Sequence, residues 1–196
     1  MLDPSYQPDR TMRLRIAGLD VGPAPEKDSI LLTGWLSRAL VVTQLHRECG
    51  IVAGLAEIGR TVTGLLHDGG FGPGPNLADT CAAIELLRSC GATPALPGLT
   101  EFVDRLQRMP FGFEATVGSS RGRLELLHAG VVCCRTLGLP VRHGRNVLAF
   151  ALACQARSGG FADASGALAD IASTHRAVEL VLALEPALAL TDGATA

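Results

Sequence analysis

Seven side chains that can move protons or bind a metal ion fall near the starts of three predicted helices. They are Asp79, Cys81, Glu125, His128, Asp170, Ser173 and His175. Carboxylates and imidazoles act as general acids and bases, and an apolar cavity that raises the pKa of a carboxyl group makes protonation feasible near neutral pH. We therefore expect Asp79 and His128 to be catalytic. Glu125 and His175 are candidates for contact with the substrate.

Two arginines, Arg121 and Arg123, directly precede the predicted helix that carries His128. Guanidinium groups beside a helix N-terminus favour anion binding, because the unpaired N–H groups and the helix dipole reinforce their charge. The pair is a candidate anchor for an anionic part of the substrate.

A purely structural interpretation stays open for each of these residues. Asp79 is a favoured type of helix N-cap, and Cys81 is of a type that is often simply buried. His128 can be a histidine whose hydrogen bonds are satisfied within the helix layers. The two arginines can belong to a solvated loop.

The elements that would position these residues form a repeat. Turns of glycine and aromatic residues, each followed by a helix, occur around Phe71, Phe113 and Phe161, which are 42 and 48 residues apart. A period in this range is typical of stacked helix pairs. Prolines separate the pairs, and no segment shows the sustained alternation of a half-buried strand. The sequence predicts an all-α protein with seven helices, at about 29–46, 50–66, 77–90, 98–108, 123–138, 143–156 and 168–184.

A single helix pair cannot bury its own apolar face, so the pairs must stack. The second helix of each pair is the better candidate for an inner layer. Ser29 is the expected N-cap of the first helix. The predicted organisation is an N-terminal arm (1–27), a repeat domain (28–190) with repeats at about 50–91, 98–139 and 143–186, and a tail (191–196).

Composition narrows the class of protein. The chain of 196 residues is 47% hydrophobic and 18% charged, which is typical of a globular domain. A net charge of −2 gives no basic footprint for nucleic acid. No uncharged apolar run approaches the roughly 20 residues of a membrane helix, and the first residues lack the apolar core of a signal peptide. Six cysteines without an export signal indicate reduced thiols, so we expect a cytoplasmic protein.

Two of the repeats resemble those of protein prenyltransferase β subunits and of squalene and terpene cyclases. The matching residues are Gly69-Gly70-Phe71 with Asp79-Thr80-Cys81, and Gly159-Gly160-Phe161 with the segment from Asp170 to Thr174. The resemblance covers roughly residues 50–186. It implies a partial α/α toroid, in which stacked helix hairpins surround a central cavity.

The two branches of this family imply different chemistry. In the prenyltransferase branch, an Asp-x-Cys at one inner-helix start and a histidine at the next hold zinc, which would be Asp79, Cys81 and His128 here. Thiolate, carboxylate and imidazole are ordinary zinc ligands, and three of them leave a position for substrate or water. In the cyclase branch, an aspartic acid at the same helix start protonates the substrate, which would be Asp79. The implied cofactor is therefore zinc or none.

Three features depart from the family pattern. Prenyltransferases place basic residues between the Gly-Gly-Phe turn and the Asp-x-Cys, whereas residues 72–77 contain none. Aromatic residues make up only 4% of the chain, which is few for a large carbocation cavity. The chain also supplies fewer helix pairs than a complete toroid, so the ring would be open, reduced or shared with a second subunit.

Three functions stay open at this point. The first is an enzyme of small-molecule, specialised metabolism that catalyses cyclisation, elimination or group transfer with Asp79 as acid or base. The second is a zinc-dependent prenyltransferase-like protein with an anionic or isoprenoid substrate. The third is a non-catalytic half-toroid that completes a partner's active site. All three predict a homodimer or heterodimer, because an open ring edge would expose apolar helices.

Overall fold

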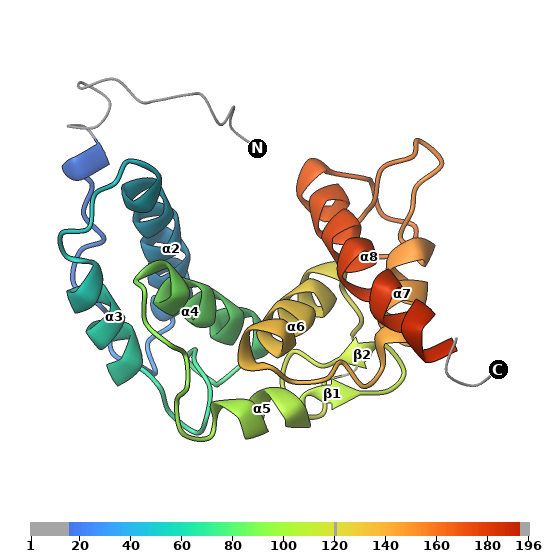
Figure 1. Ribbon diagram of the computed structural model, residues 1–196, viewed down its shortest axis with the longest axis horizontal. Helices are drawn as coiled ribbons and strands as arrows, with labels where there is room; N and C mark the ends of the chain where they lie inside the picture. The colour runs from blue at the N-terminus through green and yellow to red at the C-terminus, as the bar shows by residue number, and fades with distance from the viewer. Residues whose placement is uncertain (1–15, 120, 193–196) are drawn as a thin grey trace.

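The computed structural model describes residues 16–119 and 121–192, with side chains as far as residue 185. Seven helices dominate this part of the chain and confirm the all-α class (Figure 1). They are α2 (Leu32–Glu48), α3 (Leu55–Gly64), α4 (Leu77–Ser89), α5 (Leu99–Arg105), α6 (Leu124–Leu137), α7 (Gly144–Ala153) and α8 (Ile171–Asp192).

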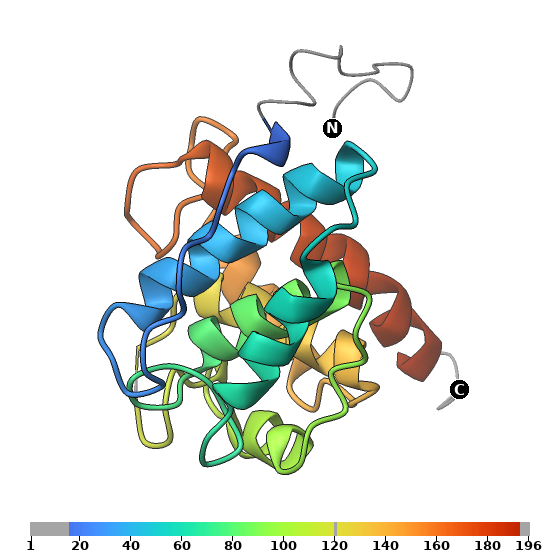
Figure 2. The same cartoon turned by 90° about the vertical axis from the view of Figure 1, so that its left-hand side faces the viewer.

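The helices form two layers. In the inner layer α2 packs on α4, α4 on α6, and α6 on α8. The outer helices α3, α5 and α7 pack on α4, α6 and α8 respectively, so each predicted pair is in contact. The inner helices follow an open arc with α2 and α8 at its two ends (Figure 1). The side view shows α3 lying outside α4 (Figure 2).

The inner helices repeat with a fixed register. Helices α4, α6 and α8 begin at residues 77, 124 and 171, which are 47 residues apart in each case. Residues 47 apart therefore occupy equivalent places, and Glu85, Val132 and Glu179 do line one cleft together. This register brings residues that are distant in the sequence to one surface.

Short antiparallel pairings precede the inner helices. In the second repeat, β1 (Gln107–Arg108) pairs with β2 (Gly112–Phe113), so the prediction of a chain without strands is wrong here. Isolated bridges mark the equivalent turns of the other two repeats. These turns are too short for alternation of polar and apolar residues to reveal them in the sequence.

Threonine side chains fasten two of these turns to the helices that follow them. The Phe71 amide donates to Thr80 Oγ1 at 3.1 Å, and the Phe161 amide donates to Thr174 Oγ1 at 2.9 Å. The matching hydrogen bonds show that the Gly-Gly-Phe sequences of the first and third repeats form the same local structure.

In the second repeat, packing of Phe113 holds the turn against the helix that follows. The Phe113 ring is buried against α6, where a Cβ on Gly130 would lie 2.3 Å from it. Only a residue without a side chain leaves room for this ring. The packing of Phe113 therefore explains why a glycine stands among the apolar residues of α6.

Loops of the following repeat accept hydrogen bonds from the N-termini of two inner helices. The Leu77 amide, at the start of α4, donates to the carbonyl of Ala115 at 2.8 Å. The Leu124 amide, at the start of α6, donates to the carbonyl of Asp163 at 2.8 Å. Amides in the first turn of a helix lack partners within the helix, so these bonds satisfy groups that would otherwise be unpaired.

Several predicted boundaries need correction. Helix α2 begins at Leu32 rather than 29, and its N-cap position is Leu31, so Ser29 is not the N-cap. Helix α8 continues to Asp192, through the start of the predicted tail. The predicted arm is described only from residue 16, and residues 1–15 and 193–196 lie outside the described chain.

The longest helix, α8, has 22 residues. Among the described residues, however, no helix combines the length and the apolar character that crossing a membrane would require.

Candidate functional site

Asp79 lies in the first turn of α4 and is only 4% exposed. The N-cap is Asn76, whose Oδ1 accepts from the Asp79 amide at 2.9 Å. In return, Asp79 Oδ2 accepts from Asn76 Nδ2 at 2.7 Å and from Thr33 Oγ1 of α2 at 2.9 Å. A Cβ on Gly72, where φ is +113°, would lie 2.4 Å from the same oxygen. The carboxylate thus joins the glycine-rich turn, α4 and α2.

Cys81 lies in the core between α4 and α6, where it is 6% exposed. It forms a hydrogen bond with the buried thiol of Cys133, and this bond, followed by burial, raises the pKa of Cys133 well above its ordinary value. The hydrogen bond directs the Cys81 side chain at α6 within the core.

His128 is directed at α8. Its Nε2 donates to Glu179 Oε2 at 2.6 Å, and His175 Nδ1 lies 3.8 Å from the same oxygen. Glu85 of α4 lies nearby. Burial is the largest influence on Glu85 and raises its pKa, while the charges of His128 and Arg88 oppose that rise.

The structure does not bring the proposed zinc ligands together. Asp79 contacts α2, Cys81 contacts α6 and His128 contacts α8. Asp79 and Cys81 diverge because residues two apart on a helix do not share a face. Throughout the described chain, no three His, Cys, Asp or Glu side chains are grouped so that they could hold a metal ion.

Arg123, one of the two arginines expected to bind an anion, contacts a carboxylate of this chain. Arg123 Nε donates to Asp163 Oδ2 at 2.6 Å, and this hydrogen bond raises the pKa of Arg123. Asp163 Oδ1 accepts from the Glu125 amide at 3.0 Å, and Glu125 Oε1 lies 3.5 Å from Arg176 Nη2. Arg123 and Glu125 therefore tie α6 to the 163 loop and to α8, whereas Arg121 is exposed in the preceding loop. Arg123 therefore already has a carboxylate partner 40 residues away in this chain, and its role as a substrate anchor stays a prediction.

Two adjoining clefts lie between the inner helices, and we refer to them together as the α4–α6–α8 groove. Both are lined by Val132, Arg135 and Glu179. The narrower cleft, of about 380 Å³, adds His128 and mostly apolar residues: Val131, Leu180, Leu182 and Ala183. The wider cleft, of about 560 Å³, adds Glu85, Arg88, Ala92, Thr93, Pro94 and Thr136. Of the predicted site residues, His128 lines this groove.

Four charged residues of the groove were not predicted from the sequence, namely Glu85, Arg88, Arg135 and Glu179. The 47-residue spacing could have predicted the two arginines, because Arg88 and Arg135 have the same separation as Cys81 and His128. Applying that interval to every charged residue of α4 would have indicated the basic pair.

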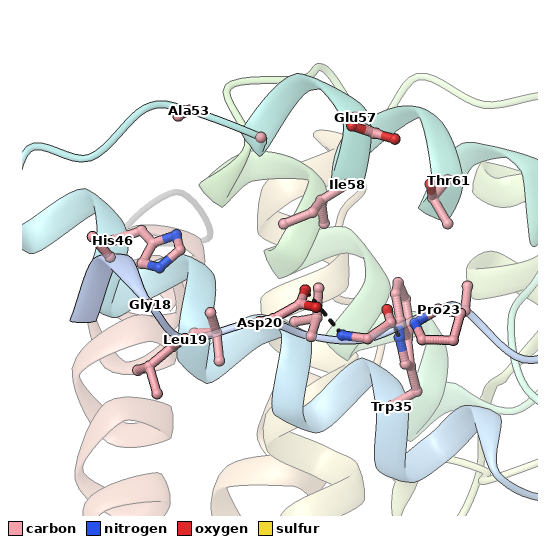
Figure 3. A pocket seen from close by; sticks show the side chains of 16 residues that line it. Gly18, Leu19, Asp20, Pro23, Trp35, His46, Ala53, Glu57, Ile58 and Thr61 are labelled. Carbon is pink, nitrogen blue, oxygen red and sulfur yellow. Dashed lines mark hydrogen bonds between the residues drawn. The ribbon is translucent and has the colours of Figure 1, made fainter. Parts of the chain in front are cut away.

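Another cleft, of about 580 Å³, lies between the segment 17–24 and helices α2 and α3 (Figure 3). Its polar groups include Asp20, Glu57 and His46. His46 Nε2 donates to the Ile16 carbonyl at 2.8 Å, and Trp35 Nε1 donates to the Gly22 carbonyl at 3.2 Å. These bonds hold the N-terminal segment on α2, which gives His46 and Trp35 a structural role.

No protein-family model matches this chain, and a search of curated proteins finds no similar sequence. The resemblance to prenyltransferases and cyclases therefore stays a prediction based on the repeat residues.

Proposed function

We propose that this protein is an enzyme of small-molecule metabolism whose acid/base residue is His128, acting in the α4–α6–α8 groove. The hydrogen bond of 2.6 Å between His128 Nε2 and Glu179 Oε2 carries the proposal. It orients an imidazole in an open cleft that apolar residues line together with Arg135 and Glu179. A groove of this kind, with a few converging polar groups, is a typical small-molecule site.

His128 and Glu179 have different roles in this proposal. Since Nε2–H donates to Glu179, Nδ1 of the neutral ring carries the lone pair and is the atom that accepts a proton from the substrate. The Glu179 carboxylate holds the ring and stabilises the imidazolium that forms. Proton removal and return of this kind serve cyclisation, elimination and group transfer, which are the reaction types implied by the family resemblance.

Asp79 has a different role in this proposal. Its carboxylate is buried and already accepts two side-chain hydrogen bonds, so it positions α2 and α4 rather than exchanging protons with substrate. In this proposal His128, and not Asp79, is the acid/base residue.

The His128→Gln variant tests the proposal, because glutamine can still donate to Glu179 but cannot take up a proton. Turnover is expected to fall by about 10²- to 10⁴-fold, the usual contribution of a general base. The assay incubates the protein with a panel of small carboxylates, phosphate esters and isoprenoid compounds and measures products by mass spectrometry.

His67→Gln is the matched control, since His67 is a histidine of the turn before α4 and lines neither cleft of the groove. It should retain wild-type turnover and circular dichroism. Equal turnover in His128→Gln and wild type would contradict the role of His128.

A second candidate function is that of a half-ring completed by another subunit, which exposed apolar residues at both ends of the arc favour. On α8 Ile171 is 91% exposed, and on α2 Val41 is 56% exposed. Burial of such residues against a partner is favourable by roughly 1.5–3 kcal/mol for each large side chain.

The self-association form of this candidate predicts twice the mass of one chain in sedimentation velocity. Val41→Asp and Ile171→Asp should shift the protein to monomer, because a buried unpaired carboxylate opposes assembly. Leu152→Asp is the control, because Leu152 is 52% exposed on the outer helix α7. A monomeric wild type at every concentration would exclude a homodimer.

A further inference from the structure

The wider cleft of the groove contains two arginines that have not yet been given a role. Arg88 of α4 and Arg135 of α6 both line it, together with Thr93 and Thr136. In the described part of the chain, neither guanidinium has a carboxylate oxygen within 4.0 Å. Arginine offers a planar fork of donors that suits carboxylate and phosphate oxygens.

Two carboxylates face the same cleft and oppose anion binding. One of them, Glu179, is engaged by His128 at 2.6 Å. The other, Glu85, is partly buried, and burial raises its pKa, which weakens the tendency of this group to carry negative charge. The positive charge of the arginines is therefore the less compensated part of the cleft, and the threonines add hydroxyl donors.

We infer that Arg88 and Arg135 bind the anionic end of an elongated small molecule, a carboxylate or a phosphate ester. The apolar part of this molecule lies in the narrower cleft against Val132, Leu182 and Ala183. The inference rests on the proposed function, because it assigns a substrate class to the same groove.

The register of α6 sets the length of the ligand. His128 and Arg135 are seven residues apart, so the helix rises about 10 Å between them. A ligand anchored at Arg135 that reaches His128 must extend over a comparable distance. Val131 and Val132 lie between these positions on α6, which favours an apolar connecting chain.

Titration calorimetry at constant ionic strength tests this inference with hexyl phosphate, hexanoate and inorganic phosphate as probes. Saturable binding of hexyl phosphate or hexanoate is expected, tighter than that of inorganic phosphate because of the apolar chain. Preference for hexyl phosphate would identify a phosphate ester as the ligand, and preference for hexanoate a carboxylate.

Arg88→Gln and Arg135→Gln should each weaken binding about tenfold or more, the usual effect of removing a charge-assisted hydrogen bond. Arg105→Gln, on the outer helix α5, should bind like wild type. Binding by neither organic probe to the wild type, or equal affinity in all three variants, would overturn the inference.

His128→Gln separates this inference from the proposed function. The two statements fail separately. Weakened probe binding in Arg88→Gln and Arg135→Gln supports the anion site whatever the turnover of His128→Gln, whereas wild-type turnover in His128→Gln overturns only the catalytic role of His128.

Discussion

Asp79→Ala should destabilise the folded state by about 1.5–3 kcal/mol, the range for hydrogen bonds to a charged group. The substitution removes the acceptor of Thr33 Oγ1 and of Asn76 Nδ2, and these bonds connect α2 to the start of α4. It also removes a negative charge from the N-terminus of α4, where the helix dipole favours one. Urea denaturation followed by far-UV circular dichroism measures the loss.

Asp170→Ala is the comparison for this experiment. Asp170 accepts from the Ser173 amide at 2.7 Å in the first turn of α8, but it is exposed and connects no second helix. We expect a smaller loss of stability there. An Asp79→Ala variant with wild-type stability and lost turnover would return the catalytic role to Asp79.

Gly130→Ala should also be strongly destabilising, by about 2–3 kcal/mol. The new methyl group would lie 2.3 Å from the ring of Phe113, which is buried and has no room to retreat. Overpacking of a filled core usually costs about 1–3 kcal/mol, which exceeds the benefit that alanine brings to a helix interior. Thermal unfolding followed by circular dichroism measures the change.

Gly34→Ala is the matched control for Gly130→Ala. Gly34 also lies within an inner helix, α2, but a Cβ there meets no atom within 4 Å. We expect a gain of about 0.5–1 kcal/mol, since alanine is the better helix former. If the two variants shift stability in the same direction, the Phe113 ring is not held as tightly as the structure indicates.

The sequence was sufficient for much of the fold. The Gly-Gly-Phe turns and the prolines predicted seven helices and their pairing, because repeat spacing and helix breakers act locally along the chain. The N-cap of α4 is Asn76 and not Asp79, the residue considered under the structural interpretation. Asp79 and Asn76 are both good N-cap types, and only the hydrogen bonds of the folded chain distinguish them.

The candidate site was harder to predict, because its contacts are long-range. The sequence offered His128 as a candidate, but its partner Glu179 is 51 residues away, and no motif around Glu179 indicates the contact. Asp79 and Cys81 are close in the sequence, yet they point to different helices. The partner of Arg123 in this chain, Asp163, is likewise 40 residues away and could not be inferred from the sequence around Arg123.

The hydrogen bonds from Leu77 to Ala115 and from Leu124 to Asp163 make neighbouring repeats dependent on each other. An inner helix obtains the partner for its first amide from a loop that is synthesised more than thirty residues later. A fragment that ends before Ala115 therefore contains all of α4 but lacks the carbonyl that completes its N-terminus. We therefore expect removal of one repeat to weaken the helix of the repeat before it.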